Sequence, residues 1–360
     1  MKNVKIAVVL MFLATSLRAQ TPQGDLNHNG VIDLSDVTLL IEAYLNKDTN
    51  PDPTQLPDTT VHDTRSIRIL SIGNSYSMDA LFYLPRLVSS ITNEVNIAVG
   101  IAYYSSATLK NHAQLAESDS KSYTFYHCDS TLDHWKRERN LSLADILSTD
   151  WDFILLQQSS FFQSDYNSYQ PWLDQLTSFV QQHQPHGTKL GWLLCPAFAQ
   201  SRIDAVKEDG TKSYNTGNYT TSDEHFAAVA QCAQNVLSGN NPVSFVVPAG
   251  TAIQNARHIA ELDTLGTTGN LTFDYVHTQD GLPRMIQAYT LAQTLFDLCG
   301  IAKGIWGNST VVSEEWLKDA GLVTAWAMRK GAPVGSLPQY YIGQQCTISA
   351  IKHPFVISAE

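Results

Sequence analysis

A serine and a histidine–aspartate pair are the residues with which this chain could carry out nucleophilic catalysis. Ser75 lies in the sequence SIGNSYSMDA, between a strand-like run and a helix-like run. Asp274 and His277 lie in DYVH, directly before a long helical pattern. Because these two are about one turn apart, the carboxylate can accept the Nδ1 proton of the imidazole and leave Nε2 for the serine. The simpler alternative makes Ser75 a turn residue and His277 a structural histidine.

Several familiar catalytic signatures are absent from the sequence. It contains no GxSxG, HExxH, GxxxxGK(S/T) or GxGxxG motif, and the first of these absences excludes the nucleophile elbow of the α/β-hydrolase fold. The five cysteines show neither a CxxC pair nor the Cys/His spacing of a zinc site. The sequence therefore predicts catalysis by side chains alone, without a cofactor.

Short apolar runs alternate with amphipathic runs from Arg65 onward. The strand-like runs are 67–72, 95–102, 153–156, 190–194 and 243–247, and the helix-like runs are 81–91, 172–182, 225–237 and 285–299. This alternation predicts an α/β fold with a mostly parallel sheet covered by helices on both faces. Such sheets bind ligands at the carboxyl ends of their strands, where Ser75 is expected to lie.

Five sequence blocks resemble a known superfamily. They are SIGNSYS (71–77), WDFILLQQSS (151–160), GWLLCPA (191–197), PAGTAIQNAR (248–257) and DYVHTQDG (274–281). In this order they resemble a bacterial branch of the SGNH (GDSL-type) hydrolases. The resemblance implies a three-layer, flavodoxin-like sandwich and an esterase activity. It also implies that Ser75 is the nucleophile, His277 the general base and then acid, and Asp274 the residue that orients the imidazole.

The same resemblance implies three donors for the oxyanion of the tetrahedral intermediate. They are the backbone N–H groups of Ser75 and Ser106 and the side-chain amide of Gln158, or of Gln157 in its place. The relatives have paired glycines where this chain has Ser105 and Ser106, so the second donor requires a backbone conformation that a non-glycine residue tolerates. Alternatively, both glutamines satisfy backbone groups at a strand end.

Residues 21–45 contain a candidate calcium loop, DLNHNGVIDLSD, followed by an amphipathic helical run. Oxygen ligands recur at the spacing of such a loop, with glycine in sixth place. The expected ligands are Asp25, Asn27, Asn29, the Val31 carbonyl, Asp33 and Asp36. This segment resembles a single dockerin type I repeat, which implies a calcium site and a protein partner. A chance polar loop is the alternative.

The ends and the charge of the chain bear on its location and partners. Residues 1–20 have the pattern of a secretory signal peptide, and residues 46–64 that of a linker, which leaves 65–360 as the hydrolase domain. We therefore expect export, to the periplasm or out of the cell, and no membrane span. The net charge of −11 argues against nucleic-acid binding. The basic run at 136–139 is predicted to be a solvated helix or loop face.

Together these patterns predict an exported serine esterase that removes acetyl or other small acyl groups from a carbohydrate. The substrate would be a small acyl ester or an acylated glycan. Two alternatives remain open at this stage: a lipid or aryl esterase of the same fold, and a non-catalytic glycan-binding or scaffold protein with a calcium module. Among the aromatic residues between Phe161 and Trp172, most are expected in the core and one or two in the cleft.

Overall fold

The structure is a computed structural model that describes residues 65–92, 94–129, 135–184, 187–301 and 337–358. The predicted signal peptide, calcium-loop segment and linker lie outside these residues, so their predictions stay predictions. Within the described residues, no helix combines the length and the hydropathy needed to cross a membrane.

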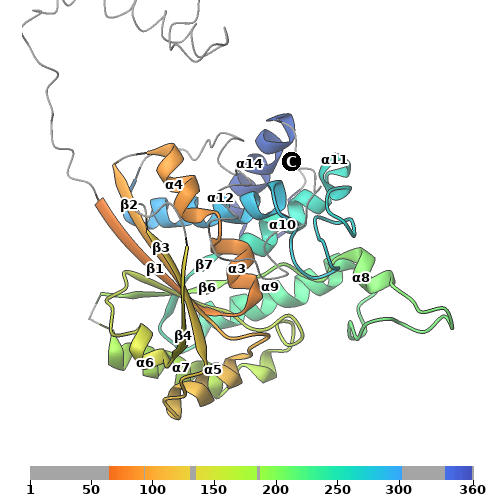
Figure 1. Ribbon diagram of the computed structural model, residues 1–360. Helices are drawn as coiled ribbons and strands as arrows, with labels where there is room; N and C mark the ends of the chain where they lie inside the picture. Colours follow the sequence, from red (N-terminus) through yellow and green to blue (C-terminus); the bar gives the residue numbers. More distant parts are fainter. Residues whose placement is uncertain (1–64, 93, 130–134, 185–186, 302–336, 359–360) are drawn as a thin grey trace, which may run out of the picture. The chain divides into compact units, whose positions relative to one another are not determined.

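A seven-stranded sheet lies at the centre of the described residues, in the order β4-β3-β2-β1-β5-β6-β7 (Figure 1). The strands are β1 Arg65–Gly73, β2 Val95–Tyr103, β3 Tyr123–Asp129, β4 Lys136–Leu141, β5 Phe153–Leu156, β6 Lys189–Leu193 and β7 Val243–Val247. Strand β1 pairs in parallel with β2 and β5, and β6 and β7 continue the parallel part. Strands β3 and β4 are antiparallel. The five parallel strands follow the order of a flavodoxin-like sheet, and the predicted α/β class is confirmed.

The central strands form where apolar runs can be buried on both faces. All four residues of β5 are buried, as expected for a parallel strand between two helical layers. Strand β1 begins exposed at Arg65 and is buried from Ile69 to Gly73. Its carboxyl end therefore lies inside the molecule, where the chain turns into the next helix.

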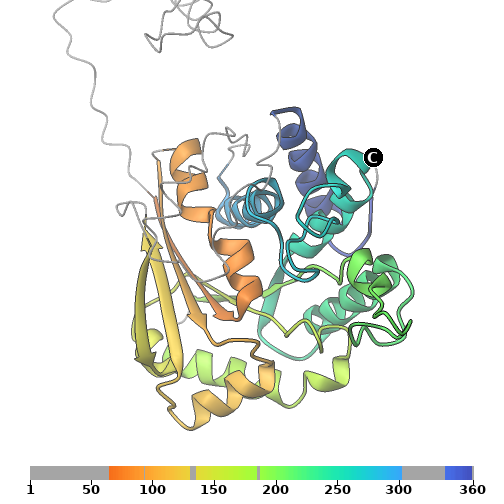
Figure 2. The same cartoon turned by 45° about the vertical axis from the view of Figure 1, so that its right-hand side comes forward.

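Helices cover both faces of the sheet (Figures 1 and 2). One face packs against α3 Ser75–Leu81, α4 Leu84–Ile91, α10 Ala249–Arg257, α12 Leu282–Cys299 and α14 Leu337–Lys352. The other packs against α5 Leu109–Glu117, α6 Leu143–Ile146, α7 Trp172–His183 and α9 Ser222–Ser238. Shorter helices are η1 Tyr166–Ser168, α8 Gln200–Asp204 and α11 Ala260–Asp263. Each layer encloses its own apolar core, so the sheet is buried on both sides.

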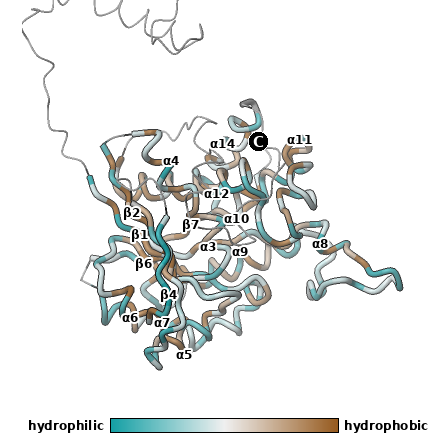
Figure 3. The backbone as a smooth tube through the Cα atoms, viewed as in Figure 1, coloured by the Kyte–Doolittle hydropathy of each residue, from teal (hydrophilic) through white to brown (hydrophobic). Residues whose placement is uncertain are grey.

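The basic run at 136–139 is a strand, and its prediction as helix or loop is wrong. It forms most of β4, at the edge of the sheet, where five of the six residues are exposed. Figure 3 shows this strand as largely hydrophilic. Charged side chains on an edge strand discourage pairing with another chain, and they remove the apolar alternation that would have revealed the strand.

The predicted helix 81–91 is divided in the structure. Helix α3 begins at Ser75 and ends at Leu81, and α4 begins at Leu84 with Pro85 in its first turn. Proline fits the first turn of a helix but not its interior, which explains why a new helix starts here. The consequence for the site is that Ser75 is the first residue of a short helix of its own.

Candidate active site

Ser75, His277 and Asp274 form one hydrogen-bonded row, although the first two are 202 residues apart. Ser75 Oγ lies 2.8 Å from His277 Nε2, and His277 Nδ1 lies 2.7 Å from Asp274 Oδ2. A carboxylate only accepts hydrogen bonds, so Nδ1 carries the proton and Nε2 is left to accept from the serine hydroxyl. This is the arrangement in which histidine can act as the base of a nucleophilic serine.

Asn74 fixes the start of α3 and joins three strand ends. Its Oδ1 accepts a hydrogen bond from the Tyr76 N–H at 3.0 Å, which caps the helix. The same oxygen accepts from Gln157 Nε2 at 2.7 Å, after β5, and Asn74 Nδ2 donates to the Ala107 carbonyl at 2.9 Å, after β2. Ser75 is therefore held at the point where the chain order of the sheet reverses, the usual ligand site of such sheets.

Gly73 is required here for space. A Cβ at this position would overlap Ser77 Oγ and come within 2.8 Å of the Gln157 side chain. Its backbone is not in the left-handed region, so a tight turn that only glycine can make is not the reason for its presence. The close approach of β1 to the end of β5 is the reason.

A tight loop presents Asp274 and His277 together. Asp274 Oδ1 accepts hydrogen bonds from the backbone N–H groups of Val276 at 3.1 Å and His277 at 2.7 Å. The Phe273 N–H donates to the His277 carbonyl at 3.1 Å, and Tyr275 between them has a φ of 70°. The left-handed residue lets the loop fold back so that one carboxylate holds both the backbone and the ring of the histidine.

The environment keeps Asp274 ionised. Its burial alone would raise the pKa of the carboxyl, but the hydrogen bonds from the His277 ring and from two backbone N–H groups outweigh burial and lower that pKa. The His277 residue is only 8% exposed. An ionised Asp274 stabilises the imidazolium that forms when His277 takes the serine proton.

A cavity of about 310 Å³ opens onto this row. Its lining includes Ser75 and His277 together with Ser106, Ser159, Phe161 and Arg202. Ser106 has a φ of 54°, the left-handed conformation that glycine adopts more readily. Position 106, where the relatives have a glycine, is thus compatible with a serine, at a cost of roughly 1–2 kcal/mol in backbone strain.

Gln158 does not lie in this cavity, and its prediction as an oxyanion donor is not supported by the geometry. Its amide nitrogen donates to Ser168 Oγ at 3.1 Å, and its oxygen accepts from the N–H groups of Leu109 at 3.0 Å and Ser159 at 2.9 Å. Gln157 is engaged as well, with Asn74 and Ser77. Gln158 thus satisfies backbone N–H groups near the end of β5, as in the alternative that the sequence left open, whereas Gln157 binds the side chains of Asn74 and Ser77.

Ser159 is a cavity residue that the sequence did not single out. The residue is 2% exposed, and its Oγ has no hydrogen-bond partner within the described residues. A buried hydroxyl without a partner loses its hydrogen bonds to water, so a ligand atom in the cavity is its natural partner. Its position next to Gln158 in the block WDFILLQQSS is the only signal in the sequence.

A buried ion-pair network ties the DYVH loop to α3. Arg284, at the start of α12, lies 2.9 Å from Asp79 and 2.6 Å from Asp280. Asp79 Oδ2 accepts the Thr278 N–H at 3.0 Å, and Arg284 Nε donates to the Thr278 carbonyl at 3.2 Å. Because Asp79 is on the helix that begins with Ser75, and Thr278 follows His277, this network sets the distance between the two halves of the row.

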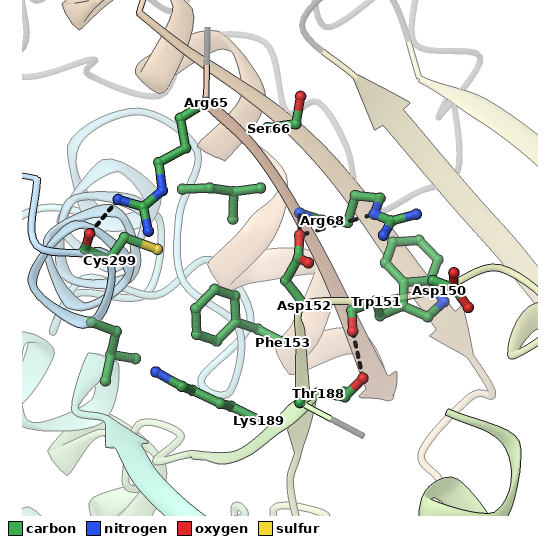
Figure 4. Close-up of a pocket in the computed structure, with 13 residues that line it drawn as sticks. Arg65, Ser66, Arg68, Asp150, Trp151, Asp152, Phe153, Thr188, Lys189 and Cys299 are labelled. Carbon is green, nitrogen blue, oxygen red and sulfur yellow. Dashed lines mark hydrogen bonds and ion pairs between the residues drawn. The ribbon is translucent and has the colours of Figure 1, made fainter. Parts of the chain in front are cut away.

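A second cavity, of about 380 Å³, lies at the amino-terminal ends of β1, β5 and β6 (Figure 4). The side chains of Arg65, Arg68, Lys189, Asp150 and Asp152 line it. Asp152 accepts a hydrogen bond from the Arg68 N–H at 2.7 Å. The lining of this second cavity contains no histidine. It therefore lacks the histidine that serves as the base in the row around Ser75. No group of three or more His, Cys, Asp or Glu suited to a metal occurs in the part of the chain that the structure describes.

The fold and the site define the class: an α/β protein with a Ser–His–Asp row at the switch point of a flavodoxin-like sheet. The chain belongs to the family described as "Domain of unknown function (DUF4886)", which matches residues 68–316. No curated protein matches it.

Two solved structures are similar to this chain. One is a DUF4886 family protein from Bacteroides uniformis ATCC 8492, with 20% identity and a TM-score of 0.62 over 82% of this chain and 98% of the other. At this identity the likeness shows the shared fold. The other is a gut microbial diltiazem-metabolizing enzyme, with 14% identity and a TM-score of 0.34 over 64% and 47% of the two chains. The second score is too low to support a structural argument.

Proposed function

We propose that this protein is a serine esterase of the SGNH type, which removes acetyl or other small acyl groups from a carbohydrate. The observation that carries the proposal is the row of Ser75, His277 and Asp274, which opens into a cavity. The sequence blocks that resemble SGNH hydrolases and the flavodoxin-like strand order support it.

In the first half of the proposed reaction, Ser75 Oγ attacks the ester carbonyl carbon while its proton passes to His277 Nε2. The C–O bond to the alcohol then breaks, and the alcohol leaves with that proton. In the second half, His277 deprotonates a water molecule that attacks the acyl-enzyme. The acid is released and Ser75 recovers its proton.

We propose three cavity groups as donors to the oxyanion. The first is the Ser75 N–H, which as the first N–H group of its helix has no acceptor within that helix. The Asn74 side chain does not accept from it, because it caps the Tyr76 N–H instead. The Ser106 backbone is the second candidate. The Ser159 hydroxyl is the third, in place of Gln158, because it alone of these side chains is buried, unpaired and in the cavity.

Replacing Ser159 by alanine is expected to lower kcat by about 10²-fold with little change in KM, since an oxyanion donor acts mainly in the transition state. Steady-state kinetics on a chromogenic acetyl ester measure this. Ser160→Ala is the matched control: its side chain lines the same cavity but is partly exposed, so kcat should change by less than a few-fold. Equal losses in the two variants would remove Ser159 from the oxyanion site.

The size of the cavity favours a small acyl group. About 310 Å³ must hold both the acyl group and part of the alcohol. The exposed ring of Phe161, 58% accessible at the rim, offers a surface on which a sugar could stack. The expectation that most of the aromatic cluster lies in the core is met fully by Tyr169 alone. Tyr166 and Trp172 are partly buried against the core, and Phe161 and Phe162 are exposed.

A series of 4-nitrophenyl esters from acetyl to octanoyl tests this proposal. We expect kcat/KM to fall at least about 10-fold from the acetyl to the octanoyl ester. We also expect the protein to release acetate from acetylated oligosaccharides. A lipid esterase would show the opposite trend, because each buried CH₂ contributes about 0.8 kcal/mol. No hydrolysis of any ester or acetylated glycan would favour the non-catalytic alternative.

Export, to the periplasm or beyond the cell, and a calcium-binding, dockerin-like segment at 21–45 that contacts a protein partner are further parts of the proposal. They rest on the sequence patterns alone. Catalysis itself is proposed to need no metal, since the cavity offers a serine, its base and hydrogen-bond donors.

A further inference from the structure

Arg202, on α8, places a buried positive charge in the cavity of Ser75. The residue is 5% exposed and lines the same cavity as Ser75 and His277. It lies among three aromatic rings, with its guanidinium carbon 4.2 Å from the centre of Tyr214, 4.9 Å from Phe198 and 5.7 Å from Phe161. A cation over an aromatic ring is attracted by the electrons of the ring, while a guanidinium group keeps five N–H donors in its plane for an acceptor.

These donors have no anionic partner in the described residues. Arg202 makes no ion pair there, and its Nε is buried without a hydrogen-bond partner. Buried charges in proteins are normally paired, because transfer out of water is costly. Arg284 illustrates the usual solution, with two carboxylates within 3 Å. Within the described part of the chain, Arg202 instead lies over aromatic rings, which compensate part of that cost.

The cavity lining offers Arg202 no carboxylate that is free to pair with it, so a bound anion could take that place. Among the residues that line the cavity, Asp274 is the one carboxylate, and it is taken by the His277 ring and two backbone N–H groups. Burial lowers the pKa of Arg202, and the nearby Asp274 and the tyrosines Tyr76 and Tyr214 act in the opposite direction. Arginine stays protonated in proteins, so the cavity keeps one cation without a bound counter-ion.

We infer that Arg202 binds a carboxylate of the substrate, and that the esters this protein hydrolyses are acyl groups on an acidic sugar. This inference rests on the proposed esterase function and names its substrate class. A single planar guanidinium with free edge donors matches one carboxylate. Phe161, which flanks Arg202 and is exposed at the rim, would then contact the ring that bears this carboxylate. The acyl group would be attached elsewhere on that ring and reach Ser75.

The test compares an O-acetylated methyl glucuronoside, which carries a carboxylate, with its neutral methyl 6-ester. Acetate release is measured for both. The wild type is expected to prefer the acid by about 10- to 100-fold in kcat/KM, the range for a charge-assisted hydrogen bond. Arg202→Gln should abolish this preference, mainly by raising KM for the acid. Arg202→Lys should restore part of it, since it keeps the charge without the planar fork.

Lys207→Gln is the matched control. Lys207 is an exposed cation five residues further along the chain and does not line the cavity, so its removal should leave the preference unchanged. A loss of preference equal to that of Arg202→Gln would mean that general surface charge attracts the acid, and would overturn the inference.

Two further results separate this inference from the proposed function. Equal rates on both substrates by the wild type would reject the acidic sugar and leave the esterase intact. If neither substrate nor a chromogenic acetyl ester is hydrolysed, the esterase is rejected, and calorimetry with free glucuronate then decides on Arg202. Binding of glucuronate but not of glucose to the wild type would support it, and no binding would overturn it. This measurement needs no variant and therefore does not depend on Arg202→Gln folding.

Discussion

Replacing Ser75 by alanine is expected to lower kcat for acetyl-ester hydrolysis by on the order of 10⁵-fold, because the nucleophile is lost and only binding and oxyanion contacts remain. Steady-state kinetics on a chromogenic acetyl ester measure the loss. The fold should survive, since Ser75 Oγ makes a single hydrogen bond, to His277. The melting temperature of the variant should therefore stay close to that of the wild type.

Ser77→Ala is the matched control for Ser75→Ala. It removes the same atom from the same helix, but the Ser77 hydroxyl donates to Gln157 at 2.7 Å and does not line the cavity. We expect it to cost about 1 kcal/mol of stability and to keep most of the activity. A fluorophosphonate should label the wild type covalently and leave Ser75→Ala unlabelled. Wild-type rates in Ser75→Ala would show that another group is the nucleophile.

The central strands could be predicted because a strand that is buried on both faces consists of a nearly continuous run of apolar residues. The run 153–156 and the run 243–247 coincide with β5 and β7. Helix α10 could not be found in this way. All nine of its residues are buried, so its polar residues Thr251, Gln254 and Asn255 do not form the solvent-exposed face by which an amphipathic helix is recognised. Its Gly250 is needed for close packing, since a Cβ there would come within 2.6 Å of the Cys195 carbonyl carbon.

In the site too, some residues could be predicted from a sequence motif, and others could be found only from the folded structure. Ser75, Asp274 and His277 could be proposed together because DYVH places the carboxylate and the imidazole within reach of each other. Gln158 shows the limit of this reasoning, since the sequence reveals an amide but not the direction in which it points. Ser159 and Arg202 stand out because each has a buried polar atom without a hydrogen-bond partner in the described residues. Only the folded structure reveals this property.

The second large effect is expected from Arg284→Leu. The residue is 3% exposed, and its loss would leave the Asp79 and Asp280 carboxylates without their cation. Removing one partner of a buried ion pair typically costs roughly 3–5 kcal/mol. Chemical denaturation is expected to show a loss of this size. Arg68→Leu is the matched control, because its ion pair with Asp152 is long, at 3.9 Å, and exposed, and should contribute less than about 1 kcal/mol.

The same variant tests whether the network positions the catalytic row or only stabilises the fold. Thr278 and Asp79 connect the His277 loop to the Ser75 helix, so loosening them should misplace Nε2 relative to Oγ. A shift of about 1 Å can cost up to about 10²-fold in rate. We therefore expect kcat to fall at least about 10-fold at temperatures where the variant is fully folded, while Arg68→Leu keeps its kcat. A folded Arg284→Leu with unchanged kcat would limit Arg284 to a structural role, because the geometry of the row would then be maintained by the Asn74 cap and the Asp274 loop alone.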